Sequence, residues 1–293
     1  MQFTEVAGPV VLFLLMLAIG LELTPADFRR VLQTPRAVVG GTLAQWILLP
    51  SMTWLVVWVV GVAPVFGAGA ILVAVSPGAG ISNVLVALGR GNVALSVSLT
   101  ATASAFAVLT LPILSSLGIR LFLDEPLDVD VPVAALTGQL MLTLLVPIAF
   151  GMAVRSRYPE EAQRLAPQLQ RITIVVILIV VFGGIALTPE DQVSFEGSER
   201  ALLAALLWTL AAIGIGWGVA TALRLPQDDR FTFLIEFSAR NVAVSSIVAI
   251  SGLGRLDLSF FSGIYVAVAY PLLALLVFWR RRRLTRAAGQ PRG

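Results

Sequence analysis

The sequence predicts an all-α membrane protein with about nine transmembrane helices, and three observations support this fold class. Of the 293 residues, 58% are hydrophobic and only 13% are charged, whereas a soluble domain has roughly 45–50% apolar residues. Apolar runs of about 20 residues, the length that a helix needs to cross a bilayer, recur between charged or Pro/Gly-containing segments. The arginines are also distributed unevenly between alternate loops, as in multi-pass membrane proteins.

The expected spans follow one another with short connections, so no separate soluble domain fits. The first has no basic residue before it and Arg29 and Arg30 after it, which favours an uncleaved anchor with its N-terminus outside. The complete set of expected spans is 8–23, 37–61, 66–89, 92–117, 131–154, 169–187, 201–223, 231–253 and 258–279.

Arginine supplies all 20 basic residues, and its distribution predicts the orientation. Alternating the spans from an outside N-terminus places 16 arginines on one face, including Arg280–Arg283, and only Arg120, Arg200 and Arg255 on the other. Basic residues concentrate on the cytoplasmic side of membrane proteins. We therefore expect a multi-pass protein of a bacterial-type inner (plasma) membrane with a cytoplasmic C-terminus, and not a nucleic-acid-binding protein.

The composition excludes several kinds of chemistry. The chain has no Cys and no His, which removes thiolate nucleophiles, disulfides, cysteine or histidine metal sites and serine–histidine hydrolysis. Every Asp falls in a loop or at the end of a span, so the acidic pair of an intramembrane aspartyl protease is missing. We expect a protein that is not an enzyme. A receptor is the remaining class, but it would not need paired interrupted spans.

The third expected span contains an interruption. It reads ILVAVSPGAGISNVLVALGR, with a proline and two glycines in the segment Ser76–Gly80, a combination that unwinds a helix. A packing kink between closely apposed helices is the structural alternative. The polar pair Ser82-Asn83, directly after the break, favours a functional role.

The eighth expected span, FTFLIEFSARNVAVSSIVAI, carries two ionisable residues, Glu236 and Arg240, at its centre. Ionisable residues inside spans are functional candidates. The segment Ser82–Val86 resembles Arg240–Val244, and the two spans are five crossings apart, so they run in opposite directions like the inverted repeats of transporters. We expect the two breaks to meet, with carbonyls that hold a cation and half-helix N-termini that face an anion.

These residues resemble the bile acid:sodium symporter family, whose bacterial members carry organic anions with sodium. Pro77–Val84 and Arg90–Val97 are similar to two signature runs of the family, and Glu236–Asn241 takes the place of a third. Gly20–Thr24, and Gln45 with Pro50, are similar to shorter motifs. The resemblance implies a nine-span form with inverted repeats, a panel and a core domain, and two crossing discontinuous helices.

The resemblance also implies two sodium sites behind the crossing. The first carries over to the oxygen donors Ser82, Asn83, Ser96, Thr100 and Glu236. Ser96 and Thr100 are four residues apart and share a helix face, although hydroxyls at this spacing also occur for helix packing alone. The second site carries over to Glu236, the backbone carbonyls of Phe237 and Ala239, Gln45, and a glutamine that is Arg240 here.

Arg240 is the largest departure from the family pattern. A guanidinium has only donors and a permanent charge, so it cannot ligate sodium. A like charge about 4 Å from a sodium ion would cost about 4 kcal/mol even at an effective dielectric constant of about 20. Three alternatives stay open: Arg240 folds back onto the Glu236 carboxylate, reaches Gln45 and stands in for the second ion, or faces the substrate cavity and binds the anion.

The resemblance implies a secondary transporter that imports a small organic anion by alternating access, with Na⁺ at one site. The alternative is a sodium-independent or proton-linked organic anion carrier of the same fold, with Glu236 as the protonation site. Substrate contacts are expected from Gly80, Ile81, Asn83 and Asn241, and Tyr265 and Tyr270 are either cavity-lining or packing residues. We treat residues 1–293 as one transmembrane domain. Its expected parts are a panel of about 8–61 and 131–187, a core of about 66–117 and 201–279, and a cytoplasmic tail of 280–293.

Overall fold

A computed structural model describes residues 3–24, 34–122, 146–187 and 197–288. These ranges are mainly helical. The β-type pairing within them is limited to one isolated bridge, between Gly78 and Arg240. The helices are α1 (Phe3–Glu22), α3 (Pro35–Val60), α4 (Pro64–Val75), α5 (Gly80–Leu88), α6 (Val93–Phe122), an unlabelled helix over 146–157, α8 (Pro159–Leu187), α9 (Ser198–Ala222), α10 (Gln227–Ser238), α11 (Val242–Ile247) and α12 (Phe260–Ala288). A π-helical turn (Val248–Gly252) and a 3₁₀ turn (Asp257–Ser259) link α11 to α12.

The described helices agree with an all-α membrane protein, but they do not establish nine spans. Among the described residues, three helices are long and apolar enough to cross a membrane, or four when the bent α6 counts as one span. Most of the expected span 131–154 lies outside the described residues. The third and eighth expected spans are each divided into two short helices, which by themselves are too short to cross.

Local sequence signals explain where the helices that build the site begin and end. Helices α3 and α4 each begin with a proline in the first turn, where the missing N–H costs no hydrogen bond. Helix α3 ends at Gly61 in the left-handed conformation (φ 65°). Helix α4 ends at Ser76, whose backbone is extended (φ −63°, ψ 147°) because the next residue is Pro77.

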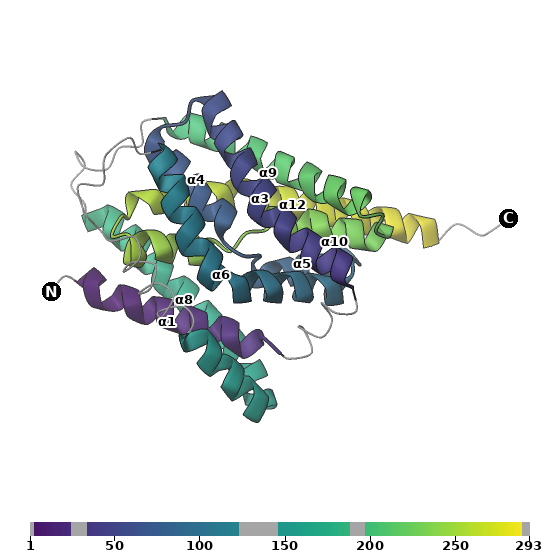
Figure 1. Cartoon of the computed structure of the whole chain (residues 1–293), viewed down its shortest axis with the longest axis horizontal. Coiled ribbons are helices and arrows are strands. Elements are labelled where there is room, and N and C mark those ends of the chain that lie inside the picture. The colour runs from purple at the N-terminus through teal and green to yellow at the C-terminus, as the bar shows by residue number, and fades with distance from the viewer. Residues whose placement is uncertain (1–2, 25–33, 123–145, 188–196, 289–293) are drawn as a thin grey trace.

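Two groups of helices are visible in Figure 1. Helices α1 and α8 pack against each other, and the 146–157 helix approaches α1 closely: a Cβ added to Gly20 would lie 2.3 Å from the Ile148 carbonyl oxygen. The second group contains α3–α6 and α9–α12. The expected panel includes span 37–61, but α3 packs against α4, α6 and α9. The division into panel and core domains stays a prediction.

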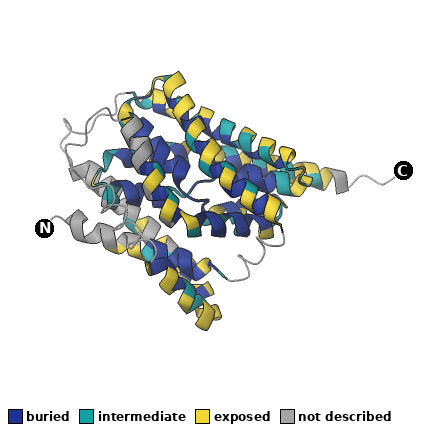
Figure 2. Ribbon diagram, in the orientation of Figure 1, coloured by how far each residue is buried: buried dark blue, intermediate teal, exposed yellow. Residues whose placement is uncertain are grey.

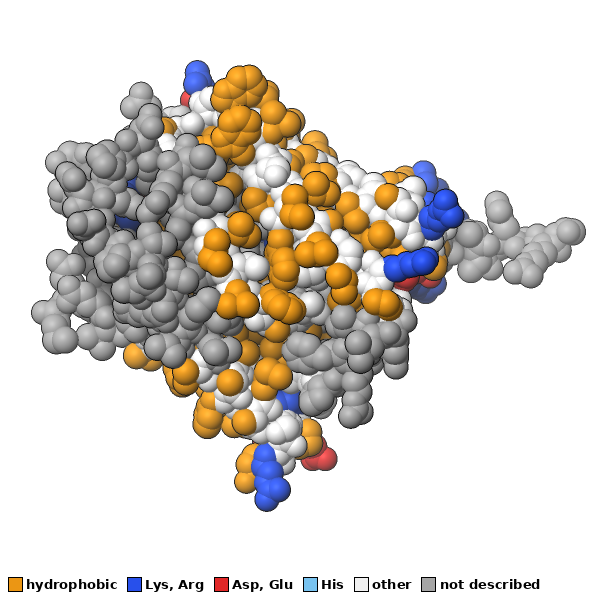
Figure 3. Space-filling view, in the orientation of Figure 1, with side chains coloured by type: hydrophobic (Ala, Val, Ile, Leu, Met, Phe, Trp, Pro, Cys, Tyr) orange, Lys and Arg blue, Asp and Glu red, His pale blue; other side chains and the backbone are white. Residues whose placement is uncertain are grey.

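The outer surface is apolar, as expected for contact with lipid. Figure 2 shows buried residues on the inner faces of the helices and exposed residues on their outer faces. Large exposed side chains include Trp58, Val59 and Leu275, and Figure 3 shows hydrophobic side chains over the middle of the molecule, with basic side chains at its top, bottom and right-hand edges. An apolar surface of this extent is typical of a protein embedded in a membrane.

Candidate functional site

The two interrupted spans meet at their breaks, through backbone hydrogen bonds. The Ala79 N–H donates to the Ala239 carbonyl oxygen (3.1 Å), and the Asn241 N–H donates to the Pro77 carbonyl oxygen (2.9 Å). Each break thus satisfies backbone groups that the other leaves without a helical partner, as the membrane interior requires. Both interruptions predicted from the sequence are present, including the one in the eighth span, which has neither Gly nor Pro.

On one side of this contact, the Glu236 carboxylate is the centre of a cluster of hydroxyl groups. Glu236 lies on α10 and is fully buried. Its Oε1 accepts hydrogen bonds from the hydroxyls of Ser82 on α5 (2.5 Å) and Ser96 on α6, and its Oε2 accepts one from Thr100 on α6 (2.8 Å). The Ser96 hydroxyl also lies 2.7 Å from Oδ1 of Asn83. The structure therefore brings together all five residues expected for the first sodium site.

Gly78 determines how closely the third span approaches this carboxylate. A Cβ added to Gly78 would lie 2.7 Å from Glu236 Oε2 and 3.1 Å from Thr100 Oγ1. The first of these distances is shorter than a van der Waals contact allows, so only glycine fits at this position without displacing the carboxylate. The sequence predicts Gly78 to be a helix breaker, and its contact with Glu236 is a second role.

From the second break, the Arg240 side chain extends into a cluster of oxygen acceptors. Its guanidinium donates to Oε1 of Gln45 (2.8 Å) and to the carbonyl oxygens of Glu236 (3.3 Å), Ala74 (3.3 Å) and Ser76. Arg240 is 1% exposed and Gln45 is equally buried. Of the three alternatives from the sequence, this geometry corresponds to the second, in which Arg240 reaches Gln45.

The carbonyls around the guanidinium are not the ones that the family resemblance implies for the second sodium site. They belong to Ala74, Ser76 and Glu236, whereas the carbonyl of Ala239 accepts the hydrogen bond from Ala79. Phe237 is fully buried and its ring stacks with that of Phe233.

Two tyrosines of α12 form hydrogen bonds with the backbone of the second break. From the sequence they are expected only as cavity-lining or packing residues. The Tyr265 hydroxyl accepts a hydrogen bond from the Arg240 N–H (3.1 Å) and donates one to the Ser238 carbonyl oxygen. The Tyr270 hydroxyl donates to the Arg240 carbonyl oxygen (3.1 Å). The two tyrosine hydroxyls thus supply hydrogen-bond partners for backbone groups of the break. No local pattern in the sequence marks this role, because both hydroxyls bond to backbone groups of a different segment.

A cavity adjoins the contact between the breaks on the side of α1. Its lining includes Ile19 and Glu22 of α1, Gly78 and Asn241 from the two breaks, and Thr100 of α6. Gly80 and Asn83, two of the expected substrate contacts, also line it. Ile81 is exposed and lies outside this lining. Asn241 caps α11 by accepting a hydrogen bond from the Val244 N–H (3.2 Å).

Sequence comparisons show which proteins this chain is similar to. The chain is 28% identical over 271 residues to a probable chloroplastic sodium/metabolite cotransporter (BASS2) of rice, covering 92% of this chain and 63% of the relative. It is 29% identical over 235 residues to the P3 protein of cattle, covering 79% of this chain and 48% of the relative. An uncharacterized sodium-dependent transporter of Bacillus subtilis, YocS, is 25% identical over 251 residues, 84% of this chain and 75% of the relative.

The chain thus spans between about half and two thirds of the length of the rice and cattle relatives. The family match itself covers residues 9–194, which include α1, α3–α6 and α8, and is well over half of the chain. This chain belongs to the Sodium Bile acid symporter family.

Proposed function

We propose that this protein is a secondary transporter that imports a small organic anion by alternating access, coupled to one Na⁺ at Glu236. The observation that carries the proposal is the buried Glu236 carboxylate, which is surrounded by hydroxyls from two other helices. A buried charge needs a compensating partner. A single carboxylate among neutral oxygen donors balances one monovalent cation, and oxygen ligands suit hard cations. Among the described residues, no group of three or more acidic side chains forms a divalent metal site.

Arg240 takes the place of a second sodium ion in this proposal. The acceptors around its guanidinium are backbone carbonyls and an amide oxygen, the same kind of ligand that unwound transporter helices offer to Na⁺. A guanidinium satisfies these acceptors permanently because it does not lose its proton in proteins. The charge is tethered to the chain, so it contributes to the site without being transported.

The anion would bind in the cavity beside the two breaks, where Gly78, Gly80, Asn83 and Asn241 contribute to the lining. The N-terminus of α5 begins at Gly80, so its positive dipole end supports an anion there. In this arrangement α1 and α8 belong to the panel that moves against the core, and the contacts of α3 favour its assignment to the core. The Arg-rich face is cytoplasmic, and a bacterial-type inner membrane with an outside N-terminus is the proposed location.

The test is uptake into proteoliposomes of a panel of organic anions, with and without an inward sodium gradient. We expect sodium-dependent uptake of at least one anion by the native protein. Glu236→Gln should abolish sodium-dependent uptake and sodium binding measured by calorimetry, because the amide cannot balance the ion's charge. Glu199→Gln, at an exposed position of α9, is the matched control. Sodium binding that survives Glu236→Gln would remove this residue from the site.

The tethered-cation part of the proposal has its own test. Arg240→Gln restores an acceptor at this position, so the variant should bind two sodium ions where the native protein binds one. Its uptake should depend on sodium concentration with a higher Hill coefficient. Unchanged ion dependence and stoichiometry in Arg240→Gln would refute the replacement of an ion by Arg240.

A sodium-independent or proton-linked carrier of the same fold is the second candidate. Its sodium-independent form is favoured by the hydroxyls of Ser82, Ser96 and Thr100, because their hydrogen bonds satisfy the Glu236 carboxylate without a bound ion. Uptake that follows a proton gradient and ignores sodium, together with loss of this uptake in Glu236→Gln, would support this candidate over sodium coupling.

A further inference from the structure

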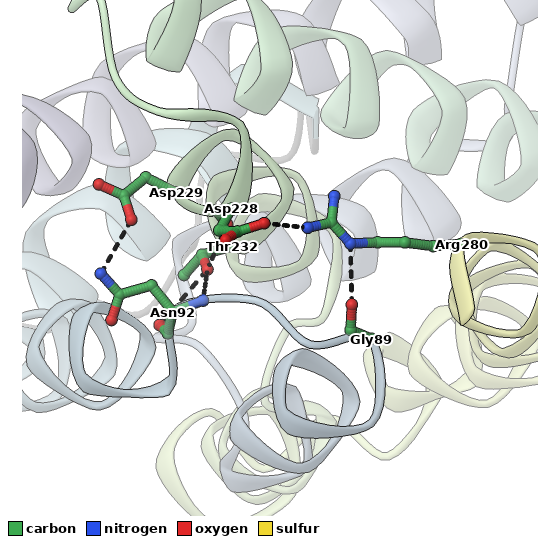
Figure 4. Close-up of polar contacts among 6 residues, drawn as sticks. All are labelled: Gly89, Asn92, Asp228, Asp229, Thr232 and Arg280. Atoms are coloured by element: carbon green, nitrogen blue, oxygen red, sulfur yellow. Dashed lines mark hydrogen bonds and ion pairs between the residues drawn. The ribbon is translucent and has the colours of Figure 1, made fainter. Parts of the chain in front are cut away.

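The polar contacts at the Arg-rich end of the molecule, shown in Figure 4, link the helices that carry the candidate cation site. We call this cluster the Arg280 network, and it consists of Gly89, Asn92, Asp228, Asp229, Thr232 and Arg280. We propose that Thr232, Asn92 and Arg280 are positioning residues: they fix the register of α5, α6 and α10, so that Ser82, Ser96 and Glu236 form one cation site. This inference rests on the proposed function.

Two contacts between α6 and α10 are spaced alike on both helices. The Asn92 N–H donates to the Thr232 hydroxyl (2.9 Å), and the Ser96 hydroxyl donates to Glu236. Asn92 and Ser96 are four residues apart, as are Thr232 and Glu236. The two contacts therefore lie about one helical turn, or roughly 6 Å, apart along both helices. A shift of one helix against the other at Thr232 would move Ser96 away from Glu236.

The side-chain amide of Asn92 fixes this register through both its nitrogen and its oxygen. Its Nδ2 donates to Oδ1 of Asp229 in the first turn of α10 (2.8 Å). Its Oδ1 accepts a hydrogen bond from the Leu95 N–H (3.1 Å) at the start of α6. The Thr232 hydroxyl is fully buried and also lies 2.9 Å from the Asp228 carbonyl oxygen. One asparagine thus caps α6 and ties it to α10.

Arg280 joins α5 to α10 in the same region. From α12, its Nε donates to the Gly89 carbonyl oxygen at the C-terminal end of α5 (2.8 Å), and its guanidinium pairs with Asp228 (2.6 Å) and stacks on the Phe231 ring (4.2 Å to the centroid). Its side chain is only 11% exposed. The neighbouring Arg282 and Arg283 instead lie over aromatic rings of their own helix. Arg280 therefore differs from Arg282 and Arg283, with which it shares the arginine run that predicts the orientation.

The glycines of this connection permit the close approach. A Cβ added to Gly89 would lie 2.3 Å from the Phe231 ring, and one added to Gly91 would lie 3.0 Å from Thr232 Oγ1. The connection between α5 and α6 is thus shaped to receive α10. The Arg280 network acts on the cation site through Ser82 and Ser96, and it does not contact the ion itself.

The test measures sodium binding to the purified protein by calorimetry and the sodium dependence of uptake. Thr232→Val keeps the side-chain shape and removes the hydroxyl. It should raise the sodium dissociation constant about five-fold, the ratio that corresponds to one net hydrogen bond, and leave the maximal uptake rate unchanged. Thr232→Ser should restore native binding. Thr209→Val is the matched control, because Thr209 is equally buried but its hydroxyl bonds only within α9.

Arg280→Gln should also weaken sodium binding, whereas Arg282→Gln should not. The positioning role would be refuted if Thr232→Val bound sodium as tightly as the native protein. It would also be refuted if Thr209→Val weakened sodium binding as much as Thr232→Val, whatever the stability of the two variants. If the proposed function is wrong, the native protein itself binds no sodium, and both proposals are then refuted. Sodium binding that Glu236→Gln removes but Thr232→Val leaves intact would refute the positioning role alone.

Discussion

The clusters around Glu236 and Arg240 adjoin the same helix break, and they hold opposite charges in different ways. Both side chains are almost completely buried and are four residues apart. The groups around Glu236 are hydroxyls, which can donate to a carboxylate or turn their lone pairs toward a cation. The groups around Arg240 are carbonyl and amide oxygens, which only accept hydrogen bonds. The first cluster is suited to an exchangeable ion and the second to a permanent charge.

Removal of the permanent charge should have the largest effect on the protein. Arg240→Met keeps a long side chain but leaves the acceptors of Gln45, Ala74 and Ser76 without donors in a buried place. Each buried acceptor left without a hydrogen bond costs about 1–3 kcal/mol, so we expect the unfolding midpoint in detergent to fall markedly.

Sodium should recover part of the stability of the Arg240→Gln variant, but it should do little for Arg240→Met. The comparison uses NaCl and choline chloride at equal ionic strength. If Arg240→Met is as stable as the native protein, the guanidinium is not required by the cluster that surrounds it.

Gly78→Ala should damage the Glu236 cluster and spare the Arg240 cluster. The added Cβ would lie 2.7 Å from the carboxylate, and overpacking of this kind costs about 1–3 kcal/mol. We expect the sodium dissociation constant to rise about thirty-fold, which corresponds to about 2 kcal/mol. Gly263→Ala, where an added Cβ meets no atom within 4 Å, is the control. An unchanged dissociation constant in Gly78→Ala would show that the ion binds elsewhere.

Tyr270→Phe should have the smallest effect, and on the Arg240 side only. The substitution removes the hydrogen bond to the Arg240 carbonyl oxygen, and the net contribution of such a bond is about 1 kcal/mol. The unfolding midpoint should fall slightly while sodium affinity at Glu236 stays native. Tyr158→Phe, at an exposed position, should change neither. A large loss of sodium affinity in Tyr270→Phe would mean that the two clusters do not act separately.

The sequence predicts the positions of both breaks because the responsible residues are local. Pro77 and Gly78 weaken the helix by backbone chemistry alone, and Glu236 and Arg240 mark the eighth span because charges inside a membrane are rare. The gathering of Ser82, Ser96 and Thr100 around Glu236 agrees with what the family resemblance implies.

The direction of the Arg240 side chain could not be predicted from the sequence. Its partner Gln45 is 195 residues away in the chain, and the carbonyls of Ala74 and Ser76 become available only because α4 ends there. The roles of Tyr265 and Asn92 also depend on tertiary structure. Their partners lie in other segments of the chain, and neither residue type by itself predicts such a contact. Long-range side-chain geometry is the part that local patterns do not contain.

The guanidinium of Arg240 sets a thermodynamic ceiling if it replaces an ion as proposed. A tenfold sodium ratio across a membrane stores about 1.4 kcal/mol per ion. A carrier that moves one such ion with each monovalent anion can concentrate that anion about tenfold from this source, whereas two ions would allow about a hundredfold. One-to-one cotransport also moves no net charge, so accumulation would not respond to membrane voltage. Replacement of the second ion by Arg240 would thus lower the anion concentration ratio that the carrier can reach, and it would make that ratio independent of the membrane voltage.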